Sequence, residues 1–276
     1  MKEERKKIIL ILLISIFMLS FCLLPVIYMV IISLSKNPDF LSAEKTLRFT
    51  LKNYFDVLSV RSLHFTDYLK NSIAVSTISA ALSVFIAALA AYSITRLNLP
   101  GKVILLFFVL VVSMFPQISL VGWLFKLMAE LGWINTYPAL ILPYIGWILP
   151  LSLWILVSYF SQLPKELDKQ ALIDGCSRWQ ILFKVLFPVA LPGLFSTFLL
   201  AFIFAFNEFM FALMLTADHK ARTIPVGIAL FQGLHGEIPW GNIMSAATIA
   251  TLPVIILTIV FQKRIVQGLT RGAVKG

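Results

Sequence analysis

The sequence predicts an all-α, polytopic membrane protein with six transmembrane helices. Of its 276 residues, 59% are hydrophobic and 13% are charged, and the mean hydropathy is +0.92. A soluble domain of this length could not bury so much apolar surface. Six continuous apolar runs reach the roughly 20 residues that a helix, rising about 1.5 Å per residue, needs to cross about 30 Å of hydrocarbon. Their continuity favours helices over a β-barrel, whose strands alternate polar and apolar residues.

The six runs follow one another along the whole chain. The first run follows a basic cluster and could also be a secretory signal, with Ser33-Leu34-Ser35 as a cleavage site. Because signal peptides have apolar cores of roughly 7–15 residues and this run is longer, we expect a retained anchor. The predicted spans are Ile8–Ser33, Asn71–Thr95, Val103–Phe125, Pro138–Phe160, Ala190–Leu215 and Asn242–Gln262.

The distribution of Lys and Arg predicts the orientation in a cell membrane. These residues are denser in one alternating set of connections than in the other, and cytoplasmic segments collect them. Both termini are therefore predicted to be cytoplasmic. The net charge of +10 then reflects topology and contact with anionic lipid, and no nucleic-acid partner is expected. We predict one domain over 1–276, with an external cap at 36–70, cytoplasmic coupling helices at 161–188, an external loop at 217–241 and a cytoplasmic tail at 263–276.

Several motifs of enzymes are missing from the sequence. The only Gly-Lys pair, Gly101-Lys102, lacks the glycine and the Ser or Thr of a phosphate-binding loop. The three histidines are scattered without metal-ligand spacing, and no Gly-x-Ser-x-Gly elbow is present. Cys22 lies in a span and Cys176 in a cytoplasmic loop, so they are not expected to pair. We expect no catalytic residue, no metal and no cofactor bound by this chain.

The cytoplasmic connection 161–188 is predicted to form two short helices about a turn. Pro164 suits a helix start, Asp174-Gly175 suits a C-terminal cap with a left-handed glycine, and Ser177 suits the next N-cap. Leu167 and Ala171 share a face, flanked by charged residues, which suits a docking socket. An ordinary amphipathic connector is the alternative. The second helix places several apolar residues under the bundle: Trp179, Leu182, Phe183 and Leu186.

This connection resembles the coupling segment of permease subunits of ABC importers. Their motif is Glu-Ala-Ala, three residues, Gly, nine residues and Ile-x-Leu-Pro; here Lys169-Gln170-Ala171, Gly175 and Val185-Leu186-Phe187-Pro188 keep that spacing. The resemblance implies the type I importer permease fold and a helix that docks into an ATPase. Lys169 replaces the Glu of the motif, so we expect an acidic partner on the ATPase. The coupling residues implied are Leu167, Asp168, Lys169, Ala171, Asp174, Gly175 and Trp179.

The resemblance extends over nearly the whole chain. Ala90–Arg96 with Leu99–Lys102, and Thr136–Tyr144, resemble connections in carbohydrate importers, and Gly268–Gly276 resembles the tail of the smaller maltose- and trehalose-type permease. That tail enters the ATPase interface, here as an extended chain. The tail residues implied in this contact are Gly268, Thr270, Gly272 and Lys275.

The resemblance also implies partners and a substrate. The partners are a second permease subunit, two ATPase subunits that bind ATP and Mg, and an extracytoplasmic solute-binding protein. An α-linked disaccharide such as trehalose or maltose is the expected substrate, and another oligosaccharide or a polyol is the alternative. A secondary transporter would need more buried carboxylates than this sequence offers, and a structural membrane scaffold would not need the coupling-segment spacing.

Polar residues inside two predicted spans are candidates for the substrate pathway. Asn207 and Glu208 interrupt an aromatic stretch of the fifth span, and Gln117 follows Pro116 in the third. Polar groups in hydrocarbon are costly unless they face the bundle interior or a wet cavity. Asn207 and Glu208 either bind sugar hydroxyls, clamp helices together, or lie at the outer interface. Gln117 either lines the pathway or satisfies a helix kink.

Overall fold

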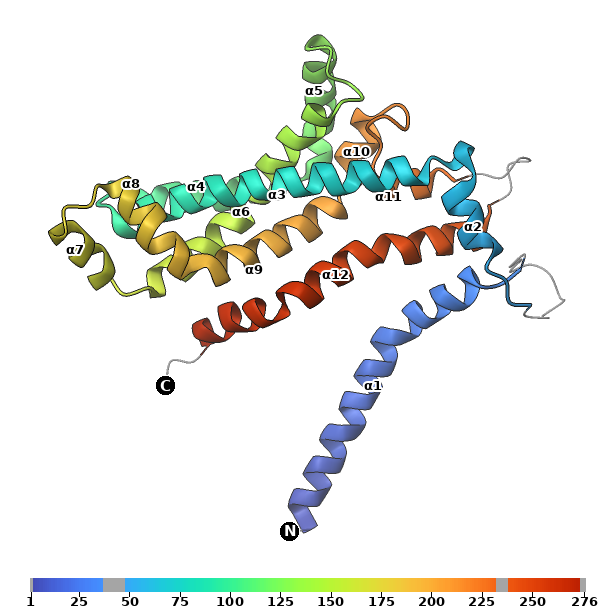
Figure 1. The fold of residues 1–276 in the computed structure, drawn as a ribbon, viewed down its shortest axis with the longest axis horizontal. Coiled ribbons are helices and arrows are strands. Elements are labelled where there is room, and N and C mark those ends of the chain that lie inside the picture. Colours follow the sequence, from blue (N-terminus) through green and yellow to red (C-terminus); the bar gives the residue numbers. More distant parts are fainter. Residues whose placement is uncertain (1, 37–47, 232–237, 274–276) are drawn as a thin grey trace. The chain divides into compact units, whose positions relative to one another are not determined.

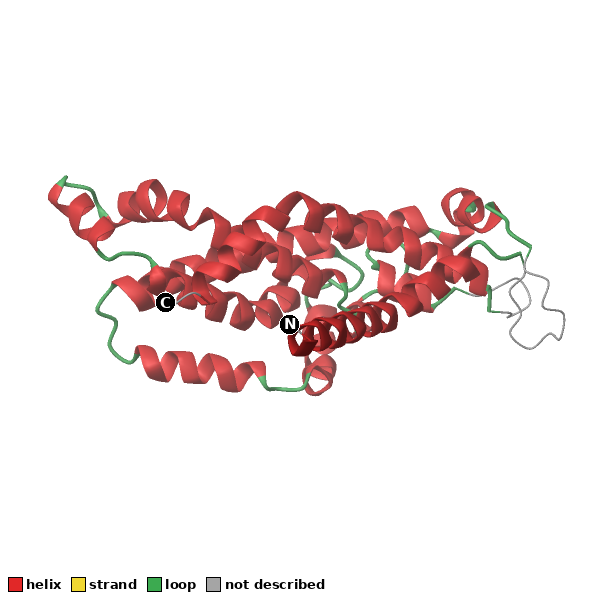
Figure 2. Ribbon diagram, turned by 90° about the horizontal axis from the view of Figure 1, so that it is seen from below, coloured by secondary structure: helices red, strands yellow, loops and turns green. Residues whose placement is uncertain are grey.

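The computed structural model describes residues 2–36, 48–231 and 238–273, with the backbone alone beyond residue 262. Apart from one β-bridge between Ser35 and Phe49, the regular structure in these ranges is helical (Figure 2), which agrees with the predicted all-α class. Five helical segments are long and apolar enough to cross a membrane, and a bent pair of helices makes a sixth span if counted as one. The five are Lys6–Ser33, Arg61–Arg96, Tyr137–Gln162, Arg178–Phe206 and Trp240–Gln262.

The larger of two compact units comprises Asp67–Val226 and Pro253–Gly276. Its long helices α3 (Phe65–Arg96), α6 (Tyr137–Gln162) and α9 (Phe187–Phe206) run side by side (Figure 1). The packing of α9 on α6 is closest at Gly193, where an added Cβ would lie 2.6 Å from the ring of Tyr159. This glycine therefore permits the helix contact that forms the centre of the unit.

The third predicted span is not one straight helix. The chain forms α4 (Lys102–Ser113) and α5 (Gln117–Glu130), which are bent by 88° relative to each other (Figure 1). Pro116, at the N-cap of α5, lacks an N–H group and disfavours helical geometry at the residue before it. The prediction of a continuous helix over Val103–Phe125 is therefore wrong.

The fifth predicted span is displaced toward the N-terminus and interrupted near its end. Helix begins at α8 (Arg178–Gln180), continues through the π-helical turn η2 (Ile181–Leu186) and runs into α9. The wider hydrogen bonding of a π turn lets the helix pass Pro188, which cannot donate a backbone hydrogen bond. Helix α9 then ends at Phe206, and a separate α10 (Met210–Leu215) follows.

The smaller unit comprises Met1–Thr66 and Gly227–Leu252. It contains α1 (Lys2–Ser33), α2 (Lys52–Ser59), η1 (Arg61–Leu63) and the start of α12 (Trp240–Ala273). The end of α1 is held by Asn53, whose amide donates to the Ser33 carbonyl at 2.8 Å, and by Ser245, whose hydroxyl donates to the same carbonyl at 3.1 Å. Ser33 and Ser35, which flank the possible cleavage site, are buried.

Two connecting segments differ from a plain loop. The external loop 217–241 contains the short helix α11 (Ile224–Ala229), and its residues 232–237 lie outside the described part. Helix α12 continues to Ala273, so the predicted extended conformation of the tail is wrong for Gly268, Thr270 and Gly272. Lys275 lies outside the described residues.

Candidate functional site

One end of the larger unit, the end predicted to be cytoplasmic, carries the predicted coupling segment, with α7 (Glu166–Ile173) followed by α8 (Figure 1). Gly175 has φ +78°, and the N–H of Cys176 donates to the Ala171 carbonyl at 2.9 Å, which closes the end of α7. Ser177 and Gln180 form a reciprocal capping box at the start of α8. The predicted left-handed glycine and N-cap are thus present, whereas Pro164 precedes the first residue of α7, Glu166, by two positions and does not start the helix.

The exposed face of α7 differs from the predicted one. Ala171 and Asp168 are buried in the unit and Leu167 is half-buried, whereas the side chain of Ile173 is 85% exposed and that of Leu172 41%. The face of Leu167 and Ala171, which was predicted to dock in a partner, therefore packs against the rest of the unit. The exposed residues of α7 and its C-terminal turn are Glu166, Lys169, Gln170, Leu172, Ile173, Asp174 and Gly175.

Trp179 lies on an exposed surface next to this segment. Its indole is 64% exposed and stacks on the ring of Phe183, with 5.9 Å between ring centroids. Leu182 and Leu186 are buried as expected for residues under the bundle. Trp179 and Phe183 therefore form a second exposed apolar group, which follows the turn after Ile173.

Sequence reasoning missed the role of Arg96. Its guanidinium is buried at the end of α3 and lies 3.2 Å from the Asp168 carboxylate in α7. It also donates to the carbonyls of Phe160 (2.9 Å) and Leu163 (2.8 Å) at the end of α6. In the sequence, Arg96 was recognisable only as one of the basic residues near a predicted cytoplasmic connection. Its pairing required the fold of α7 against α3 and α6.

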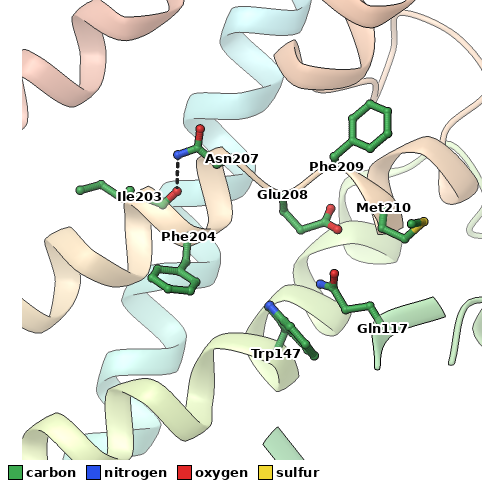
Figure 3. A pocket seen from close by; sticks show the side chains of 8 residues that line it. All are labelled: Gln117, Trp147, Ile203, Phe204, Asn207, Glu208, Phe209 and Met210. Carbon is green, nitrogen blue, oxygen red and sulfur yellow. Dashed lines mark hydrogen bonds between the residues drawn. The ribbon is translucent and has the colours of Figure 1, made fainter. Parts of the chain in front are cut away.

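The three pathway candidates, Gln117, Asn207 and Glu208, line one pocket of about 530 Å³ (Figure 3). The pocket lies where α5 begins, where α9 ends and beside Trp147 of α6. The remaining lining residues are Ile203, Phe204, Phe209 and Met210. The bend at Pro116, which the kink alternative for Gln117 had allowed for, and the break after Phe206, which was not predicted, therefore bring these polar residues to the same cavity.

Glu208 has a structural role within this pocket. It is 7% exposed, and its two carboxylate oxygens accept the N–H groups of Phe211 (2.8 Å) and Ala212 (3.1 Å) at the start of α10. The first N–H groups of a helix have no intrahelical partner, and a carboxylate satisfies them well. Asn207 donates its amide to the Ile203 carbonyl at 2.8 Å. Among the described residues, Gln117 makes no hydrogen bond through its side chain.

At the opposite end of the larger unit, amide side chains hold the start of the external loop. Asn71 donates to the carbonyls of His219 and Arg222, both at 2.9 Å, and accepts the Tyr137 hydroxyl at 2.7 Å. Asn135 donates to the Asp218 carboxylate at 2.8 Å. This bond, with a further one from the Lys220 N–H, lowers the pKa of Asp218.

Residues 83–271 match the family described as the binding-protein-dependent transport system inner membrane component. The chain belongs to this family. It is therefore a multi-pass permease of the cell membrane and a transport subunit, not an enzyme. Membership implies in general a partner permease, an ATPase and a solute-binding protein. The predicted permease identity and fold class are confirmed.

Relatives of this permease include sugar transporters. It is 55% identical over the full length of both chains to the trehalose/maltose transport system permease protein MalG of Thermococcus litoralis. It is 42% identical to the trehalose transport system permease protein SugB of Mycobacterium tuberculosis, over 93% of each chain. Its fold matches a chain of a bacterial ABC transporter that imports alginate with a TM-score of 0.77 at 21% identity, over 95% of this chain and 97% of the other.

Proposed function

We propose that this permease is one of two non-identical membrane subunits of an ATP-driven importer for an α-linked disaccharide, trehalose or maltose. The observation that carries the proposal is the 55% identity to a trehalose/maltose permease along the entire chain. Two separate ATPase subunits bind ATP and Mg, and a solute-binding protein delivers the sugar. Both termini and the segment 161–188 lie in the cytoplasm, in keeping with the density of basic residues there.

The exposed surface of α7 is proposed to enter the ATPase. Exposed Ile173 and Leu172 offer an apolar anchor, and exposed Lys169 offers a positive charge for an acidic residue of the partner. Trp179 adds a second exposed apolar group after the turn that follows Ile173. An exposed apolar group on a cytoplasmic turn is a reason to expect a protein partner there.

The pocket near Glu208 is proposed to hold the sugar during passage. The free amide of Gln117 and the carbonyl oxygen of Asn207 offer a donor and an acceptor for hydroxyl groups. Trp147 and Phe204 supply aromatic surface for a sugar ring. Glu208 keeps this wall in place through its bonds to α10, so its contribution is both structural and electrostatic.

Purification of the tagged permease in mild detergent tests the proposed assembly. A second permease and an ATPase are expected to co-purify, and the reconstituted complex with its binding protein is expected to hydrolyse ATP faster with trehalose or maltose than with other sugars. Stimulation by a different oligosaccharide or by a polyol would show that the proposed substrate is wrong, while the proposal of an ATP-driven importer would stand. Absence of an ATPase would contradict the proposal itself.

Substitution of Gln117 by Leu tests the pocket, because it keeps the side-chain size and removes the free amide. We expect an apparent affinity for the sugar about two- to tenfold weaker, since a neutral hydrogen bond contributes about 0.5–1.5 kcal/mol. The measurement is uptake against sugar concentration in proteoliposomes. Gln262→Leu is the matched control, because Gln262 is exposed on α12 and does not line the pocket. Equal affinities in both variants would exclude Gln117 from the pathway.

A further inference from the structure

The Arg96–Asp168 pair connects three helices that meet at the end of the larger unit predicted to be cytoplasmic. Arg96 is the last residue of α3, Asp168 lies in the first turn of α7, and the two carbonyls that Arg96 binds belong to the end of α6. The side chains of the pair are 3% and 10% exposed. One guanidinium thus fixes the positions of all three elements.

The chain itself joins only two of these three elements. Helix α6 continues into α7 through residues 163–165, and α7 continues through Gly175 into α8 and α9. Helix α3 has no such connection to α7, because its chain runs on to α4. A displacement of α7 reaches α6 and α9 through the backbone, whereas it reaches α3 through side chains. The buried ion pair of Arg96 is the direct link to α7, and Tyr92 of α3 also interacts with Arg178 of α8.

The charges suit the helix ends that they occupy. At the end of α6 the Phe160 carbonyl accepts the N–H of the C-cap residue Leu163 at 3.2 Å, and Arg96 adds a second donor to it. Arg96 also donates to the Leu163 carbonyl, and its cation opposes the negative end of the helix dipole. Asp168 places a negative charge in the first turn of α7, which the dipole also favours. Lysine could not replace this arginine, because a guanidinium can hold several acceptors in a fixed plane and an ammonium is a compact point charge.

The carboxylate of Asp168 depends on this one cation. In the part of the chain that the structure describes, neither of its oxygens accepts a hydrogen bond of good geometry, and Arg96 is its ion-pair partner. A buried pair of this kind often contributes little net stability compared with apolar residues of similar size, whereas removal of one partner leaves an uncompensated buried charge. Its presence is therefore better explained by a requirement for position than by a requirement for stability.

We propose that Arg96 and Asp168 are positioning residues that make α3 and α6 move together with α7 during the transport cycle. The inference rests on the proposed function, because it assigns the movement to docking of α7 in an ATPase. Loss of the pair then leaves assembly and ATP hydrolysis in place. It lowers the number of sugar molecules imported for each ATP hydrolysed, because α3 no longer follows α7.

The test uses the complete transport complex in proteoliposomes and measures sugar uptake and ATP hydrolysis in the same sample. Asp168→Asn and Arg96→Lys are expected to lower the uptake per ATP about fivefold or more, in the range of measured couplings between sites. Glu130→Gln is the control, because it breaks an exposed pair with Lys126 (3.9 Å) on α5, where both partners are more than half exposed. This control is expected to keep the wild-type ratio.

A double variant separates positioning from folding. Arg96→Met with Asp168→Met removes both buried charges, so it is expected to assemble even where Asp168→Asn leaves Arg96 unpaired and fails. If the double variant assembles with a low ratio of uptake to hydrolysis, the proposal is supported. A wild-type ratio in any assembled variant of the pair, or failure of all of them to assemble, would overturn it. If the wild-type complex itself shows no sugar-dependent hydrolysis, the proposed function fails instead.

Discussion

The segments 163–177 and 207–224 both leave the end of a long helix, but they are held in opposite ways. The segment 163–177, which we call the inner segment from its predicted topology, is held by the Arg96 side chain at Asp168 and Leu163 and by the apolar packing of Ala171, and the other side of α7 is exposed. The outer segment, 207–224, is held at several points of its backbone. Asn71 donates to the carbonyls of His219 and Arg222, and Asn135 accepts the N–H groups of Ala217 and Asp218. Within the segment, Glu208 accepts the N–H groups of Phe211 and Ala212. The polar side-chain contacts of the inner segment thus centre on Arg96, whereas those of the outer segment are spread over several residues.

Under the function proposed above, this difference fits two different tasks, with α7 docking in an ATPase and the segment 207–224 meeting the delivered solute. A helix that transmits movement must be connected firmly at one point and free elsewhere, because additional bonds would oppose its displacement. A loop that meets a delivered solute gains from being ordered beforehand, because binding then costs less conformational entropy. We therefore expect the outer segment to be the more rigid of the two.

Substitution of Asn71 by Ala should have the largest effect, and it tests whether side-chain hydrogen bonds make the outer segment the more rigid one. It deprives the His219 and Arg222 carbonyls of their donor and the Tyr137 hydroxyl of its acceptor. Each group left unsatisfied costs about 1–3 kcal/mol when buried. Hydrogen exchange of the 216–224 backbone should become much faster, while exchange in α7 stays unchanged. Unaltered exchange in the loop would show that Asn71 does not hold it.

Substitution of Gly175 by Ala should have a smaller effect, at the inner segment. The space around this glycine is open, so the change adds no clash, but its φ of +78° is unfavourable for any residue with a Cβ. A left-handed conformation costs about 1–2 kcal/mol for such a residue. Thermal unfolding should show this loss. Gly122→Ala on α5 is the control, because its surroundings are also open and no positive φ is required there.

The sequence was sufficient for the local features of the inner segment and insufficient for its orientation. Gly175 and Ser177 were predicted correctly because a left-handed glycine and an N-cap depend on a few neighbouring residues. Whether Ala171 or Ile173 faces outward depends on how α7 packs on other helices, and both residues lie on a short helix of mixed polarity. Tertiary packing decided between them.

The candidate pocket shows the same division. Composition identified Gln117, Asn207 and Glu208 as costly polar residues in apolar runs, which is a local property. That they share a cavity follows from breaks at Pro116 and after Phe206. The first break has a local cause in a proline. The second break depends on Glu208, which accepts N–H groups at the start of α10, two residues further on. Because the fifth span is apolar on both sides of this break, its hydropathy gave no sign of it.

The smallest effect is expected at Asp218, where the stability of the outer segment should depend on pH. Hydrogen bonds from Asn135 and the Lys220 N–H favour the ionised carboxylate, so the pKa of Asp218 is lower in the folded protein than in the unfolded chain. Its stabilising contribution is therefore complete above the ordinary pKa of about 4 and is lost as the pH falls through the lowered value. Asp218→Asn should lower the Tm slightly at pH 7, and this difference from the wild type should vanish in acid. A difference that stayed constant down to pH 3 would mean that the charge of Asp218 does not help to hold the outer segment.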